Sequence, residues 1–214
     1  MLLQALQGIG QQVRSVVIAM RCPGCRQIAT FDGAIPHDAG LLYNGQIVQA
    51  GLRVCPNPSC RTVIYFIWDV SVGNLLASYP PERLDFDSAN IPASITKALE
   101  EAITCHANEC FIAGAIMVRK TLEELCHDRG TKGNNLKERL RNLGTAVILP
   151  QELLGGLDDL RLLGNDAAHI ESQEYSTVGK EEVGVGIEFT KEVLKAVFQY
   201  SNLLGRLRSL KRTP

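Results

Sequence analysis

The sequence lacks a long hydrophobic run. No segment approaches the roughly 20 apolar residues that a membrane-spanning helix requires. The N-terminus has no basic region ahead of its apolar residues, and Gln and Gly interrupt those residues, so the pattern is not that of a signal peptide. We therefore expect a cytoplasmic protein with no membrane partner.

The chain also lacks an excess of charge of either sign. Its formal net charge is −1, from 22 Lys and Arg against 23 Asp and Glu. The first 80 residues carry 5 basic and 3 acidic residues, and the remainder carries 17 and 20. Strong non-specific binding to nucleic acid depends on many phosphate contacts, so this balance disfavours it. A local basic site stays open.

Repeats, low-complexity tracts and glycine-rich phosphate loops are absent as well. Gly184 and Gly186 do not form a dinucleotide-binding fingerprint, because no predicted strand precedes them and the third glycine is missing. A nucleotide-binding function is therefore the weakest candidate. Hydrophobic residues make up 45% of the chain, which is enough for a packed core and argues against global disorder.

Seven cysteines are present, an odd number. In a cytoplasmic chain, closely spaced cysteine pairs indicate metal binding rather than disulfides. Two residues separate Cys22 from Cys25, four separate Cys55 from Cys60, and each pair lies in a turn beside a predicted strand. Because Zn²⁺ prefers four such ligands and four cysteines leave no open position for catalysis, we predict a structural zinc site. Two unbound thiol pairs are the alternative interpretation.

Other cysteines and histidines give weaker signals. His37 lies between the two cysteine pairs, in a predicted exposed loop, and is not expected to be a ligand. A second group lies on or near predicted helices, where cysteines are usually core or incidental residues. A second metal or a nucleophilic pair is the less favoured interpretation of this group. Its members are Cys105, Cys110, Cys126, His106 and His127.

Local patterns predict an α+β chain with two domains. A short amphipathic helix is predicted over residues 2–13, and Tyr79-Pro-Pro indicates a linker. The predicted domains are a small β-rich zinc ribbon over 1–80 and an all-α antiparallel bundle of four or five helices over 81–214. The predicted strands cover 16–20, 46–54 and 62–70. The predicted helices cover 92–106, 109–129, 136–143, 150–169 and 181–210.

Three polar residues, Arg161, Asn165 and His169, recur every four positions in the fourth predicted helix. At about 100° per residue they fall within a sector of about 80°. Arg can bind a phosphate, His can transfer protons near neutral pH, and Asn can orient either of them. The trio suits RNA chemistry, and it equally suits a polar network that packs this helix on its neighbours.

The same helix has an apolar face and two leucines on its polar side. Leu154 and Leu162 fall on that polar side, where we interpret them as a second buried contact such as a dimer interface. The predicted core face consists of Leu153, Leu157, Leu160, Gly164, Ala167 and Ala168.

Charged side chains on the other helices have two interpretations each. Arg119 and Glu123 are four residues apart, so they predict a local ion pair on the helix surface. The alternative is a buried pair that braces the Arg161 helix as a supporting network. The basic C-terminal residues are interpreted as a solvated helix end, with nucleic-acid contact as the alternative. They are Arg206, Arg208, Lys211 and Arg212.

Two segments carry a family resemblance, ECFIAGAIMVRKTLE at 109–123 and LRLLGNDAAH at 160–169. Together with the cysteine module and the linker, they resemble a bacterial family of unknown function in the HEPN superfamily, over about residues 15–205. The resemblance implies a bundle of four or five helices that often dimerises. It also implies that active members are metal-independent RNases with an Arg-x4–6-His motif. In those members the His assists attack by the RNA 2′-hydroxyl, and the Arg steadies the phosphate.

Seven residues separate Arg161 from His169, which lies outside that spacing. We therefore predict a non-catalytic, HEPN-like module that forms a homodimer and binds a protein or a nucleic acid in a bacterial defence or restriction setting. The alternative is a metal-independent endoribonuclease that uses Arg161, Asn165 and His169 across the dimer.

Overall fold

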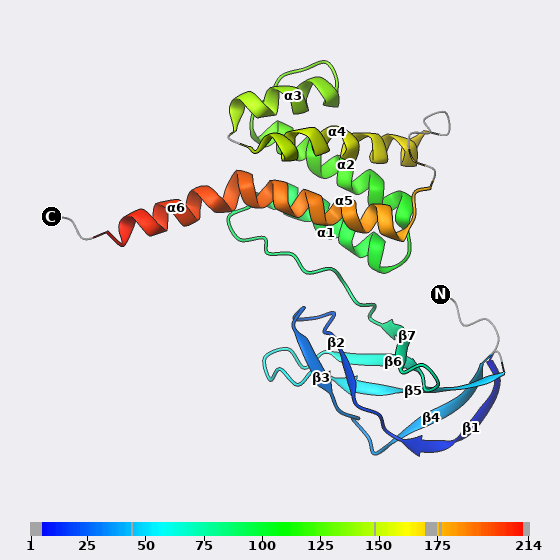
Figure 1. The fold of residues 1–214 in the computed structure, drawn as a ribbon. Helices are drawn as coiled ribbons and strands as arrows, with labels where there is room; N and C mark the ends of the chain where they lie inside the picture. The colour runs from blue at the N-terminus through cyan, green and yellow to red at the C-terminus, as the bar shows by residue number, and fades with distance from the viewer. Residues whose placement is uncertain (1–5, 44, 148, 170–174, 176, 212–214) are drawn as a thin grey trace. The chain divides into compact units, whose positions relative to one another are not determined.

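The computed structural model of the chain describes residues 6–43, 45–147, 149–169, 175 and 177–211. Within these residues the fold is α+β, because antiparallel strands come first and helices follow (Figure 1). The chain divides into two compact units, Met1–Asp85 and Phe86–Pro214. The first unit contains the strands and the second contains the helices.

A five-stranded antiparallel sheet and a two-stranded hairpin build the first unit. The hairpin packs on one face of the sheet, because its Ile18 and Phe31 share a buried cluster with Ile64 and Phe66. In spatial order, the sheet consists of β1 (Leu6–Arg14), β4 (His37–Tyr43), β5 (Gln46–Val54), β6 (Val63–Asp69) and β7 (Asn74–Tyr79). The hairpin consists of β2 (Ile18–Arg21) and β3 (Ile28–Phe31).

The predicted N-terminal helix is wrong. Its residues 6–13 lie in strand β1, which pairs with β4, and its residues 2–5 lie outside the described part of the chain. The pairing of β1 shifts register between Leu6 and Gly8 and again between Ile9 and Gln12. Such shifts break the two-residue alternation of a strand, so its apolar residues acquire a spacing that imitates a helix.

The other strand predictions have mixed outcomes. The strand over 46–54 is confirmed as β5, and the strand over 62–70 is confirmed as β6 with one residue fewer at each end. The predicted loop around His37 is wrong, because β4 begins at that residue. Strand β7 has no counterpart among the predicted strands, and it extends to Tyr79, the first residue of the predicted linker.

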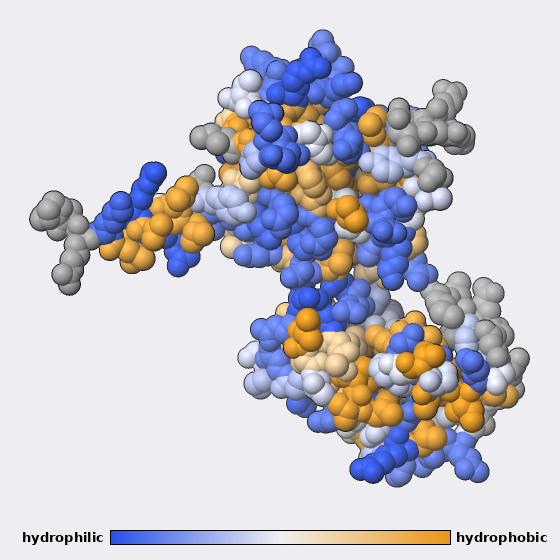
Figure 2. Space-filling model, in the orientation of Figure 1, coloured by the Kyte–Doolittle hydropathy of each residue, from blue (hydrophilic) through white to orange (hydrophobic). Residues whose placement is uncertain are grey.

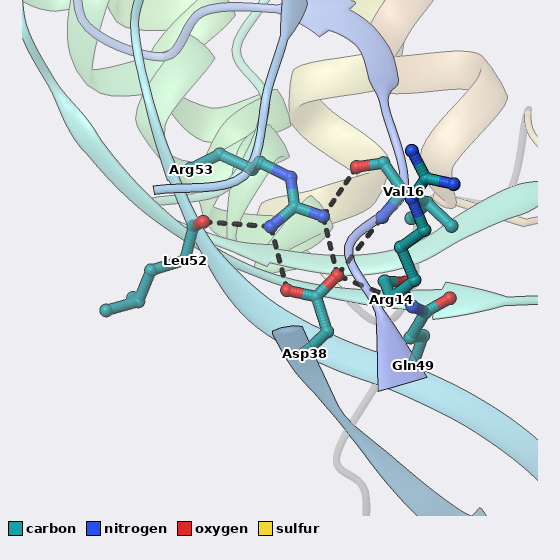
Figure 3. A network of polar contacts seen from close by, with 6 residues as sticks. All are labelled: Arg14, Val16, Asp38, Gln49, Leu52 and Arg53. Atoms are coloured by element: carbon teal, nitrogen blue, oxygen red, sulfur yellow. Dashed lines mark hydrogen bonds and ion pairs between the residues drawn. The ribbon is translucent and has the colours of Figure 1, made fainter. Parts of the chain in front are cut away.

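A buried ion pair joins β4 to β5 (Figure 3). Arg53 of β5 donates to both carboxylate oxygens of Asp38, at 2.9 and 2.7 Å, and both side chains are fully buried. The same guanidinium donates to the Val16 carbonyl at 2.6 Å and lies 4.2 Å from the centre of the Phe66 ring. Gln49 and the Val16 amide also donate to Asp38. The pair therefore ties β4 and β5 to the segment that leads into β2.

Helices make up the second unit, and none of the described ones is long and apolar enough to cross a membrane. Pro92 and Pro150 precede the first turns of two helices, as predicted, because proline is tolerated where no amide partner is needed. Asn135 caps a third helix by accepting from the Glu138 amide at 2.9 Å. The elements are α1 (Ala93–Ala107), α2 (Phe111–Asp128), α3 (Leu136–Ala146), α4 (Gln151–Ala168), α5 (Lys180–Leu194), the π-helical segment η1 (Lys195–Gln199) and α6 (Tyr200–Ser209).

Helix α2 contacts α1, α4 and α5, helix α5 also contacts α1 and α4, and α3 packs on α2 and α4. Their shared core is apolar and includes Leu99, Ile103, Leu122, Leu157 and Ile187, all less than 2% exposed. The last three elements run on from one another as a single rod, and α6 extends away from the other helices (Figure 1).

Candidate functional site

Two turns of similar construction carry the four cysteines of the first unit. In the turn between β2 and β3, the Cys22 amide donates to the Gln27 carbonyl at 2.9 Å, and Arg26 has a φ of +61°. In the turn between β5 and β6, the Cys55 amide donates to the Thr62 carbonyl at 2.9 Å, and Arg61 has a φ of +52°. In each turn, the residue that follows the second cysteine has a positive φ, and a backbone hydrogen bond joins the two ends of the turn.

The second pair has four residues between its cysteines instead of two, and hydrogen bonds within its turn accommodate the additional residues. The Asn57 carbonyl accepts from the Cys60 amide at 3.0 Å, and the Asn57 side chain accepts from the Ser59 amide at 3.0 Å. Gly24 lets the two turns lie close together, since a Cβ there would stand 2.0 Å from the Thr62 hydroxyl and 3.0 Å from the Cys60 sulfur. The sequences of both turns thus favour the approach of the two pairs.

The four sulfur atoms lie within 4.8 Å of one another, so they could hold a metal ion. The Cys22 and Cys60 sulfurs are 3.7 Å apart, and so are the Cys25 and Cys55 sulfurs. A tetrahedron with metal–sulfur bonds of about 2.3 Å has edges of roughly 3.8 Å, so the observed spacing fits four-coordinate thiolate ligation. Cys22 and Cys55 are fully buried, whereas Cys25 and Cys60 are partly exposed.

The environments of these thiols differ electrostatically. Burial raises the pKa of Cys55 to about 12, although a backbone amide at Asn57 opposes the rise. The Thr62 hydroxyl and amide lower the pKa of Cys60 to about 6, because their hydrogen bonds favour the thiolate. One ligand is therefore poised as a thiolate, and a cation would supply the charge that stabilises the buried ones.

The other thiols and histidines do not join this cluster. His37 is exposed at the start of β4. The Cys126 thiol is buried in α2, and His106 contacts the Lys180 carbonyl at 3.1 Å. Among the described residues, the only group of three or more potential ligands close enough to hold a metal is the cysteine quartet.

The structure does not bring Arg161, Asn165 and His169 into one site. The Arg161 guanidinium pairs with Asp158 at 2.6 Å, one turn earlier on α4. Asn165 instead accepts a hydrogen bond from Arg119 of α2. His169 is exposed at the C-terminal cap of α4, and it follows Arg161 by eight positions, which corresponds to about 12 Å along the axis.

Arg119 and Glu123 form the ion pair that their spacing predicts, at 3.4 Å and partly exposed. Because Arg119 also donates to Asn165, this pair connects α2 to α4. Leu154 has a partner within its own chain, since it lies about 3.1 Å from the position of a Cβ on Gly144 of α3. On the predicted core face Leu157, Leu160 and Gly164 are buried, but Ala168 is exposed. Leu163, which is not part of the predicted core face, is also buried.

Replacing Gly164 with alanine is expected to destabilise the helical unit by about 1–3 kcal/mol. A Cβ at Gly164 would stand 2.5 Å from the Arg119 Cβ, so α2 and α4 would have to move apart and the Arg119–Asn165 hydrogen bond would be disturbed. Urea unfolding followed by circular dichroism at 222 nm measures the change in the free energy of unfolding.

Gly155 on the same helix is the matched control, because nothing lies within 4 Å of its Cβ position. Alanine there should be neutral or stabilising by up to about 1 kcal/mol. Equal effects at both positions would contradict the close packing.

A groove of about 410 Å³ lies between α3 and α4. Leu140, Leu154 and Leu157 line it, together with Lys137, Arg141 and Asp158. The hydrogen bond from Arg161 lowers the pKa of Asp158, and the charges of Lys137 and Arg141 lower it further. Arg161 therefore pairs directly with this carboxylate, whereas Lys137 and Arg141 line the same groove as Asp158. No sequence motif indicates this groove, because its lining residues come from two helices and meet only in the folded chain.

The family profile of DUF4145, a domain of unknown function, matches residues 100–212 of the chain. The chain belongs to the DUF4145 family. The matched residues include α2, α4 and the groove, whereas the four cysteines precede the DUF4145 region. No curated protein and no solved structure matches the chain.

Proposed function

We propose that this DUF4145 protein is a non-catalytic RNA-binding module whose N-terminal unit is held together by a structural Zn²⁺. The observation that carries the proposal is the α3–α4 groove, in which two cationic side chains, Lys137 and Arg141, line the wall beside Asp158. Groups of this kind hold phosphates, with Arg as the stronger geometric partner. The near-neutral chain then binds RNA through one local basic site rather than through its whole surface.

The same geometry supports binding without cleavage. Lys137 and Arg141 line the groove over the N-terminal half of α4, whereas His169 lies at the other end of that helix. Asn165 is engaged with Arg119, and Arg161 with Asp158. A general base acts only within hydrogen-bond reach of the proton that it abstracts, and within one chain His169 does not share a site with the cationic groove.

The resemblance to the HEPN superfamily agrees with this proposal and adds the setting. It suggests a helical bundle that acts in bacterial defence or restriction, and its active members act on RNA. In this chain the longer Arg161–His169 spacing favours a member that binds RNA but does not cleave it. Four buried and half-buried cysteine sulfurs suit Zn²⁺, which would fix the two turns of the first unit.

Binding of a labelled single-stranded RNA, measured by fluorescence anisotropy at several salt concentrations, tests the proposal. The double variant Lys137→Glu, Arg141→Glu should weaken binding at least about tenfold at low salt, and each lost phosphate contact should reduce the salt slope by about 1. Lys97→Glu, at an exposed position of α1, is the matched control and should leave the affinity nearly unchanged. If the double variant and Lys97→Glu lose RNA affinity equally, the result contradicts a local binding site in the groove.

Cleavage is tested on the same protein with a brief chelator treatment that keeps the fold, checked by circular dichroism. We expect folded wild type to leave the RNA intact. Metal-independent cleavage that disappears in both His169→Ala and Arg161→Ala would instead establish an endoribonuclease and overturn the non-catalytic assignment.

A further inference from the structure

The C-terminal helix α6 has an exposed leucine face. Its side chains recur every three or four residues, which places them along one side of the helix. A helix of a globular protein normally buries such a stripe. Figure 2 shows the hydrophobic surface along this extended helix. The exposed fractions are 60% for Leu203, 52% for Leu204, 60% for Leu207 and 80% for Leu210.

Basic side chains accompany the leucines of this segment. Arg206, Arg208 and Lys211 lie between or beside the leucines, and residues 200–211 contain no acidic residue. All three cations are exposed. A partner of α6 should therefore offer an apolar surface with acidic side chains at its edge.

The same chain contains a surface with these properties, between α4 and α5. A groove of about 400 Å³ is lined by the apolar residues Leu163, Val185 and Phe189 and by the acidic residues Asp159 and Glu181. Val185 is 63% exposed, which is unusual for a valine on a packed helix. Both acidic side chains are exposed. The groove and the leucine face match in hydrophobicity and are opposite in charge.

Helix α6 cannot fill the groove of its own chain. The helical backbone continues from α5 through η1 into α6, with Lys195 and Tyr200 both in the right-handed helical region. Leu203 follows Phe189 by fourteen positions, which places the two residues about 21 Å apart along a single rod. The occupant must therefore come from another molecule.

We propose that two copies of this chain exchange their C-terminal helices, each placing the leucine face of α6 in the α4–α5 groove of the other. The midpoint between the groove residues of α5 and the leucines of α6 falls in η1. Two rods that run antiparallel and cross at η1 thus make both contacts at once and form a closed two-fold pair. The area that one helix face can bury is small compared with the roughly 1,200–2,000 Å² that specific interfaces bury. Reciprocal exchange doubles that area. This surface is separate from the α3–α4 groove, so the inference does not depend on RNA binding.

Sedimentation velocity on the full-length, metal-loaded protein tests the exchange. Wild type should sediment as a dimer at micromolar concentration, and Leu207→Asp should raise the dimer dissociation constant at least about 100-fold. Val72→Asp is the control, since Val72 is 67% exposed but lies in the first unit. Circular dichroism confirms that the variants are folded.

Charge reversal tests the match between the two surfaces. Arg208→Glu and Glu181→Lys should each weaken the dimer about tenfold, and the double variant should recover most of the loss. A structural defect in either variant would not be repaired by the second reversal. No recovery would overturn the pairing of α6 with this groove.

Other outcomes are equally decisive. A monomeric wild type, or a dimer that Leu207→Asp does not weaken, overturns the proposal. If monomeric wild type binds vesicles containing phosphatidylserine and Leu207→Asp does not, α6 is a membrane-surface helix instead. Lys137→Glu, Arg141→Glu should remain dimeric, so failure of the RNA proposal and failure of the exchange give different results.

Discussion

Replacing Cys22 with serine is expected to abolish metal binding at the cysteine quartet and to unfold the N-terminal unit while the helices stay folded. Cys22 is fully buried and lies 3.7 Å from the Cys60 sulfur. Structural Zn²⁺ sites contribute apparent free energies of about 10–16 kcal/mol. That is comparable to the whole stability of a domain, about 5–15 kcal/mol. Because the two turns contain Cys22 and Cys55 as part of the hydrophobic cluster, loss of the metal also exposes the core of this unit.

Trp68 is the only tryptophan and packs against that cluster, so its fluorescence reports on the first unit alone. Metal content is measured by elemental mass spectrometry, with one equivalent expected in wild type and almost none in Cys22→Ser. The helical signal at 222 nm should change little. Cys110→Ser is the control, because Cys110 is exposed and lies outside the quartet. If the Cys22→Ser protein still binds one equivalent of metal, the assignment of the metal site to the cysteine quartet is wrong.

Features that depend on neighbouring residues were accessible from the sequence. Each cysteine turn is a local structure, since its hydrogen bonds join residues only a few positions apart. The first turns of α1 and α4 follow Pro92 and Pro150, whose effect on a helix start is also local. The Arg119–Glu123 pair depends on i,i+4 spacing alone.

Features that depend on tertiary contacts were not accessible. Arg53 follows Asp38 by fifteen positions in the sequence, and only the register of β4 against β5 brings them together. Asn165 was grouped with Arg161 by helical periodicity, but its hydrogen bond comes from Arg119, 46 residues away. Periodicity gives the direction of a side chain on its own helix and says nothing about which neighbour arrives there.

The buried pair leads to the second large effect. Asp38→Ala is expected to destabilise the N-terminal unit by about 3–5 kcal/mol, because it leaves the Arg53 guanidinium buried without its counter-ion. Both side chains are fully buried, and Arg53 donates to both carboxylate oxygens. Salt should change this cost little, since buried pairs are screened far less than exposed ones.

Denaturant unfolding followed by Trp68 fluorescence measures the cost in the metal-loaded protein. Asp32→Ala is the matched control, because Asp32 is exposed in the same unit and should change stability by less than about 0.5 kcal/mol. The double variant Asp38→Leu, Arg53→Met separates the cost of an unpaired charge from the value of the pair. Apolar replacement of both partners is often neutral or stabilising, so the double variant should be more stable than Asp38→Ala. If the double variant is instead the less stable protein, the carbonyl of Val16 and the ring of Phe66 depend on Arg53 itself, and the pair stabilises the sheet beyond charge balance.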